Sequence, residues 1–213
     1  MKKIIALALL LLAAQLVIYA HPHTAFSVRL DFEFEGTNCT GFWEEWTFDP
    51  FFSAEIFSMF DKDANGVFSQ DETDMVYNNA FINLRKYGFW TIIRVNGKRS
   101  SPDRVEQFSV HKKDARVVYR FRVPVAAGSL GTDFHVAIFD TTYYCAISYE
   151  DDPVRISQLG STKPAIRWQR EVNRESPIYY NPAGAANDNT VYDTWRQGLQ
   201  TAWPEEIHIQ VGQ

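Results

Sequence analysis

The feature that constrains this chain most is an acidic twelve-residue stretch, Asp61–Glu72, which lies between two segments with helical periodicity. Before it, apolar residues recur every four positions behind Asp49-Pro50, a pair that suits the start of a helix. Within it, Ser69 and Glu72 have the spacing of a capping box, which opens a second helix. The sequence therefore predicts a helix–loop–helix at about residues 50–87.

The acidic stretch matches the calcium-binding loop of an EF-hand position by position. Calcium takes six to eight oxygen ligands, and such a loop offers them at positions 1, 3, 5, 7, 9 and 12. Gly66 occupies position 6, where the backbone turns sharply. The predicted ligands are Asp61, Asp63, Asn65, Val67 through its carbonyl, Ser69 and Glu72. A lone loop of this kind suits a structural clamp on two helices, and an acidic loop that holds no ion is the alternative.

The rest of the chain has mostly the period-two pattern of half-buried strands. In residues 24–35, for example, every second residue from Phe26 to Phe34 is apolar. The predicted strands are 24–35, 41–48, 89–95, 105–111, 115–123, 133–139, 143–149, one near 165–171, and 207–211.

Two later segments are expected to differ from this β pattern. Residues 150–190 are rich in Pro, Asn, Gly and Ser, and irregular coil is predicted for most of them. Residues 191–203 carry apolar side chains four apart and end before Pro204, which predicts a short C-terminal helix. The expected fold class is α+β, an antiparallel sheet or sandwich with the helix–loop–helix inserted between its second and third strands.

The first twenty residues have the pattern of a secretory signal peptide. Two lysines precede an apolar run, Ile4–Ile18, and Ala20 supplies a small residue before a polar segment. The run is shorter than the roughly 20 residues that a membrane span needs, so a membrane anchor is the less favoured alternative. We therefore expect an exported, periplasmic chain in which residues 21–213 form one domain and no later segment crosses a membrane.

Charge and cysteine usage narrow the possibilities further. Removal of residues 1–20 leaves 19 Lys and Arg against 26 Asp and Glu, with no basic cluster of the kind that binds nucleic acid. Cys39 and Cys145 are the two cysteines. In an oxidising compartment an even pair predicts a disulfide, and two buried thiols are the alternative.

His21-Pro22-His23 follows the expected cleavage position and would gather three nitrogen donors, counting the new α-amino group. Imidazole nitrogen suits zinc, nickel, cobalt and copper. Pro22 has no amide hydrogen, so a copper site that needs a deprotonated second amide cannot form. A transition-metal site at His21 and His23 is predicted, with Asp140, His135 and Asp49 as further candidate ligands; an unbound tail is the alternative.

Six separated motifs resemble one known family in their order along the chain. They are HPH (21–23), WTFD (46–49), DxDxNG (61–66), YGFWT (87–91), FDTTYY (139–144) and EDDPV (150–154), and their combination resembles the DUF1007 family. The resemblance implies an exported protein, since members are described as periplasmic components of transport systems and some accompany nickel, cobalt or zinc transporters. It therefore implies an accessory role in metal transport or homeostasis, with a membrane transporter as partner.

The sequence lacks the motifs of the common hydrolases. No H-E-x-x-H pair, Gly-rich phosphate loop or nucleophile with a motif-placed base is present, so no catalytic residue is assigned and the chain is not expected to be an enzyme. Two alternatives to the accessory role stay open. One is a calcium-stabilised interaction module without a transition metal, and the other is a copper enzyme that uses His21 as a brace.

Overall fold

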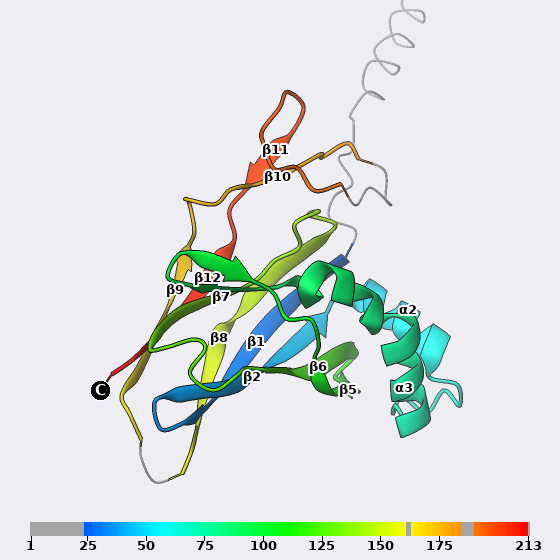
Figure 1. Cartoon of the computed structure of the whole chain (residues 1–213). Helices are drawn as coiled ribbons and strands as arrows, with labels where there is room; N and C mark the ends of the chain where they lie inside the picture. Colours follow the sequence, from blue (N-terminus) through cyan, green and yellow to red (C-terminus); the bar gives the residue numbers. More distant parts are fainter. Residues whose placement is uncertain (1–23, 161–162, 185–189, 213) are drawn as a thin grey trace, which may run out of the picture.

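Two five-stranded sheets pack face to face in the computed structural model, which describes residues 24–160, 163–184 and 190–212 (Figure 1). The first sheet has the order β5-β6-β2-β1-β8 and consists of β1 (Thr24–Glu35), β2 (Asn38–Phe48), β5 (Glu106–Lys113), β6 (Arg116–Pro124) and β8 (Cys145–Leu159). The second has the order β4-β3-β7-β12-β9 and consists of β3 (Thr91–Val95), β4 (Lys98–Ser100), β7 (Asp133–Ile138), β9 (Ile166–Val172) and β12 (Glu205–Val211). A separate ribbon pairs β10 (Ile178–Tyr180) with β11 (Gln200–Ala202). The α+β class is confirmed.

The core lies between the two sheets, and the alternation in β1 shows why. Every second side chain from Phe26 to Phe34 is buried, so one face of β1 meets the second sheet. Phe32 contacts Phe134 of β7 with ring centroids 6.0 Å apart. The hydroxyl of Tyr149 in β8 accepts a hydrogen bond from the backbone N–H of Ile138, also in β7, at 3.1 Å. These contacts join the two sheets around one hydrophobic core.

The predicted helix–loop–helix region contains α2 (Pro50–Phe60) and α3 (Gln70–Asn79), inserted between β2 and β3. Figure 1 shows both helices beside β5 and β6, at one side of the sandwich. Ile56 and Phe60 of α2 are buried, and the Ser53 hydroxyl accepts the backbone N–H of Val117 in β6 at 2.9 Å. The loop between the helices is therefore carried by a pair of elements anchored to the first sheet.

The second helix is shorter than predicted. It ends at Asn79, and a 3-10 segment, η1 (Phe81–Trp90), follows in place of α-helix up to residue 87. Gly88 and Phe89 have positive φ angles of 60° and 53°, which bend the chain. The bend lets Phe81 and Phe89 stack in the core with centroids 5.4 Å apart, so packing has overridden helical periodicity.

The predicted C-terminal helix is absent from residues 190–203, which the structure does describe. Gly198 has a φ of +94°, and Gln200–Ala202 pairs with β10 as a strand. The apolar side chains that suggested a helix stay exposed: Val191 is 53% exposed and Trp195 is 58% exposed. A short helix without a packing surface is marginal in water, and this segment forms turns and β11 instead.

The β8 strand corrects two further expectations. It continues to Leu159, so the coil predicted from residue 150 onward begins ten residues later. It also pairs with β1 in parallel, which makes the first sheet mixed and not purely antiparallel. As an edge strand β8 leaves one side unpaired, and its charged residues at 150–152 are tolerated there.

The predicted disulfide is wrong, because both cysteines are buried free thiols. Cys39 pairs with Phe34 at one end of β1, whereas Cys145 pairs with Thr24 at the other end. Ten residues of strand span about 33 Å, far beyond the roughly 7 Å that a disulfide allows between Cα atoms. Burial raises the pKa of Cys39 to about 12.

Candidate metal-binding sites

The α2–α3 loop, taken as residues 61–72 and so including the first three residues of α3, is folded by hydrogen bonds to its own first residue. Asp61 forms the C-cap of α2, and its carboxylate accepts the backbone N–H groups of Asn65 at 3.1 Å and of Gly66 at 2.8 Å. Gly66 has a φ of +77°, as the predicted turn at position 6 requires. The backbone at the centre of the loop is thus folded around the carboxylate of position 1.

Three carboxylates converge in this loop. Asp61, Asp63 and Glu72 each offer an oxygen, and these atoms all lie within 4.8 Å of one another. The Glu72 carboxylate accepts backbone N–H groups from Ser69 at 2.9 Å and from Lys62 at 2.6 Å. Hydrogen bonds from Ser69, then from Lys62, hold the pKa of Glu72 below its ordinary value, so the carboxylate stays ionised at neutral pH.

The other three predicted ligands lie in the same loop but make different contacts. The Asn65 amide oxygen accepts the N–H of Val67 at 2.6 Å, and its amide nitrogen donates to Asp63 at 2.7 Å. The Ser69 hydroxyl donates to Glu72 at 2.8 Å and caps α3. Three carboxylate donors with further amide, hydroxyl and carbonyl oxygens alongside are the ligand set of a hard cation.

Aromatic packing fixes the loop against the helix before it. Phe68, the apolar residue of position 8, stacks on Phe57 of α2 with centroids 5.3 Å apart. The ammonium of Lys112, from β5, lies 5.5 Å from the centre of the Phe57 ring. The Phe57 ring of α2 therefore lies between Phe68 of the loop and Lys112 at the edge of the first sheet.

Asp49 and Asp140, two candidates for the second site, both lie near the start of β1. Asp49 caps α2 and also accepts the backbone N–H of Ala25 at 2.9 Å. Asp140 is buried and accepts the backbone N–H of Cys145, the residue paired with Thr24, at 3.0 Å. Burial raises the pKa of the Cys145 thiol, and the charges of both aspartates add to that shift.

A cavity of about 310 Å³ opens at the same place, and Thr24 and Asp140 are among its lining residues. His21 and His23 lie outside the described residues, so the predicted site at the N-terminus stays a prediction. Asp49 and Asp140 already use their oxygens in a helix cap and a turn, and these contacts explain both residues without an ion.

His135, the remaining candidate, lies in a different part of the molecule. It is in the middle of β7, on the outward face of the second sheet, opposite His208 of β12. Among the described residues, its nearest acidic and histidine side chains are Asp133, His208, Glu171 and Glu206. The structure therefore separates His135 from Asp49 and Asp140.

Comparison with known proteins agrees with the motifs quoted above. Residues 6–211 match the profile of a family described as "Protein of unknown function (DUF1007)". The chain belongs to the DUF1007 family. It is also 25% identical to an uncharacterized 15.5 kDa protein in the trpE 3′ region of Spirochaeta aurantia, over 137 residues that cover 63% of this chain and 94% of the relative.

This DUF1007 chain has a further ionisable group that sequence analysis missed. Glu44 in β2 is fully buried between the sheets, where Trp46 donates to one carboxyl oxygen at 2.8 Å and Thr91 lies 2.7 Å from the other. Burial raises the pKa of Glu44 to about 8, although the two hydrogen bonds from Thr91 and Trp46 act to lower it. The period-two pattern contained the signal, because it places Glu44 in the inward row between Phe42 and Trp46.

Within the described residues, no helix is long and apolar enough to cross a membrane. The apolar run at residues 4–18 lies outside that part of the DUF1007 chain, and export remains a prediction from its sequence.

Proposed function

We propose that this chain is a non-enzymatic metal-binding protein of the periplasm that binds calcium at residues 61–72 and assists transition-metal transport or homeostasis. One observation supports the calcium site above all others: the carboxylate oxygens of Asp61, Asp63 and Glu72 lie within 4.8 Å of one another. Like charges at such distances repel, and a divalent cation among them removes that repulsion.

The loop favours calcium over other cations because of its donor atoms. All three converging groups are carboxylates, and calcium prefers many oxygen ligands in flexible geometry. Transition metals prefer imidazole nitrogen or thiolate sulfur, and residues 61–72 contain no histidine or cysteine.

The position of the loop favours a clamp over a switch. It joins α2 to α3, and both helices pack on the first sheet through buried residues such as Ile56 and Val76. An ion held by Asp61 at the end of α2 and Glu72 at the start of α3 ties the two helices together. We therefore assign calcium a stabilising role.

The accessory role in metal transport rests on the family resemblance and on the signal-like segment. Some DUF1007 proteins accompany nickel, cobalt or zinc transporters, and residues 1–20 have the pattern of an export signal. A membrane transporter for such a metal is the partner that this role implies.

Calcium titration of the purified mature chain tests the proposal. At a calcium concentration 100 times Kd, we expect Tm to rise by about 5–10 °C, because ligand binding at that level adds about 2.7 kcal/mol to the free energy of unfolding. Glu72→Gln should abolish the shift, whereas Asp71→Asn, a neighbour outside the ligand set, should keep it. No shift at millimolar calcium would contradict the proposal.

A further inference from the structure

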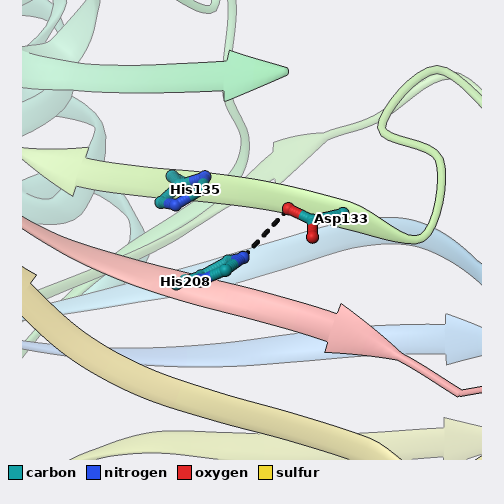
Figure 2. Close-up of side chains that lie close together, drawn as sticks. All are labelled: Asp133, His135 and His208. Carbon is teal, nitrogen blue, oxygen red and sulfur yellow. Dashed lines mark hydrogen bonds and ion pairs between the residues drawn. The ribbon is translucent and has the colours of Figure 1, made fainter. Parts of the chain in front are cut away.

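Two histidines from distant parts of the sequence lie against each other on the outward face of the second sheet. His135 of β7 and His208 of β12 occupy directly paired positions of the antiparallel ladder. Their rings are stacked, with centroids 3.9 Å apart and planes 11° from parallel (Figure 2). The pairing of β7 with β12 therefore holds the two imidazoles side by side on the surface of the sheet.

Each imidazole also has a carboxylate partner. Nε2 of His208 lies 2.9 Å from Oδ1 of Asp133, as the dashed line in Figure 2 marks. Nε2 of His135 lies 2.9 Å from Oε1 of Glu171, which projects from β9. Asp133, His135 and His208 each offer one donor atom, and the three atoms lie within 4.8 Å of one another.

We propose that Asp133, His135 and His208 form a binding site for a divalent transition-metal ion, zinc, copper, nickel or cobalt. Two imidazoles and one carboxylate are a ligand set that these ions prefer. A tetrahedral zinc ion with bonds of about 2.0–2.1 Å needs donors about 3.3 Å apart, so binding would draw the three donor atoms together and turn the imidazoles out of their parallel stack. The site is separate from both the calcium loop and His21-Pro22-His23.

Glu171 strengthens the site as an orienting residue. A metal-bound histidine usually donates its other ring N–H to a carboxylate, which fixes its tautomer. The Glu171 bond to Nε2 of His135 leaves Nδ1 of that ring for the ion.

A second group of donors, His135 with Glu171 and Glu206, is less suited to a cation. The Glu206 carboxylate is 1% exposed and accepts hydrogen bonds from Arg94 at 3.0 Å and from Asn173 at 2.7 Å. Arg99 lies 3.6 Å from its other oxygen. Two guanidinium groups thus neutralise Glu206, whereas Asp133 has no arginine or lysine partner among the ion pairs of the described residues.

The exposure of the three ligands indicates what such a site does. The Asp133 side chain is 60% exposed, whereas that of His208 is 12% exposed. The site is therefore shielded from solvent on the side of the sheet and accessible to solvent at Asp133. Three protein ligands leave a coordination position for water or for a donor from another molecule, unlike a closed structural site. An ion held in this way can be passed on.

This inference rests on the proposed function and deepens it, because it names a place where the transition metal binds. The experiment below distinguishes a failure of this histidine site from a failure of the proposed function. Zinc binding is measured by calorimetry on the full mature chain with His21→Ala and His23→Ala, which remove the N-terminal imidazoles. We expect His208→Ala to weaken zinc binding by at least about 100-fold, since even residues that only orient a ligand contribute about 10–100-fold. His111→Ala, which changes an exposed histidine of β5, is the matched control and should change the affinity less than about threefold.

Asp133→Asn is a second variant that keeps a hydrogen-bond acceptor for His208 but removes the charge, and we expect at least about tenfold weaker zinc binding. Cobalt(II) added to the parent chain should give the visible absorption of a tetrahedral N/O site, which His208→Ala should remove. Zinc binding weaker than about 100 µM, or unchanged by His208→Ala and Asp133→Asn, would overturn the inference. Calcium binding by the same samples reports separately on the loop.

Discussion

The two candidate metal sites of this chain are built in opposite ways. The α2–α3 loop takes its donors from twelve consecutive residues and needs only local turns to bring them together. The histidine site joins Asp133 to His208 across 75 residues and exists only once β12 has paired with β7. The first cluster offers oxygen donors and the second is rich in nitrogen, so under our proposals a hard and a softer cation would bind at separate places.

Changes in pH alter the stability of the core that carries both sites, and the buried carboxyl group of Glu44 is one source of this dependence. Its pKa of about 8 in the folded chain exceeds the ordinary value of 4.5, so the unfolded chain loses a proton that the folded chain keeps as pH rises between those values. The stability that Glu44 contributes is complete below pH 4.5 and declines until about pH 8, by up to about 5 kcal/mol. Glu44→Gln should remove this decline, as measured by urea unfolding at pH 5 and pH 8.

The adjacent Glu45→Gln is the control for that measurement, because Glu45 is partly exposed and pairs with Arg29 and Lys113 on the outer face. It should leave the pH dependence close to that of the parent. Parallel stability curves for the parent and Glu44→Gln would show that Glu44 is not held neutral in the core. Otherwise Glu44→Gln gives a background in which metal binding at both sites can be compared across pH.

Loosening the second sheet should affect only the histidine site. Ile209 is fully buried next to His208 in β12, and Ile209→Ala should lower the free energy of unfolding by about 2–5 kcal/mol. We expect weaker zinc binding with unchanged calcium affinity, both measured by calorimetry well below Tm. Val76→Ala, in the core-facing side of α3, is the matched change for the loop and should show the reverse pattern. Equal effects of either variant on both metals would mean that the sites are coupled.

The difference between a site built from consecutive residues and a site built by strand pairing also explains how much of the molecule could be predicted from sequence. The capping box of Ser69, the turn at Gly66 and the alternation in β1 are local, and each predicted its element correctly. The pairing of β12 with β7 leaves no local signal. His208 is consequently missing from the predicted ligands, and His135 is grouped with Asp140 instead.

The wrong predictions of a C-terminal helix and of a disulfide also arise because the sequence pattern gives no information on long-range pairing. The apolar spacing at 191–203 predicts a helix, but Val191 and Trp195 are exposed and residues 200–202 pair with β10. Cys39 and Cys145 each lie near a strand end, yet those are opposite ends of β1. Periodicity reports which face a residue occupies and not which distant residue lies beside it.

A substitution at Gly66 tests whether calcium binding depends on the local backbone conformation of the loop. Gly66→Ala places a Cβ at a φ of +77°, a conformation that costs an L-residue about 1–2 kcal/mol and that the calcium-bound loop requires. The ion-free loop can relax, so we expect calcium affinity to fall by about 5–30-fold. Gly97→Ala, at a φ of +75° in the β3–β4 turn with open space around it, is the matched control. It should lower stability without changing calcium affinity, and an equal loss of affinity would attribute the Gly66→Ala effect to global destabilisation.

The smallest expected effect comes from a single charge beside the loop. The ammonium of Lys112 lies 3.2 Å from where a Cβ on Gly66 would stand, close enough to repel a bound cation. Lys112→Gln should raise calcium affinity by about 2–5-fold in low salt, since a surface charge contributes less than about 1 kcal/mol, and the gain should fade as salt is added. Lys113→Gln, whose ammonium lies 3.9 Å from Glu45, should leave calcium affinity unchanged. Neither substitution should change zinc affinity, because the histidine site lies on the other sheet. A change in zinc affinity would show that the net charge of the chain, and not the position of the lysine, controls the binding of both metals.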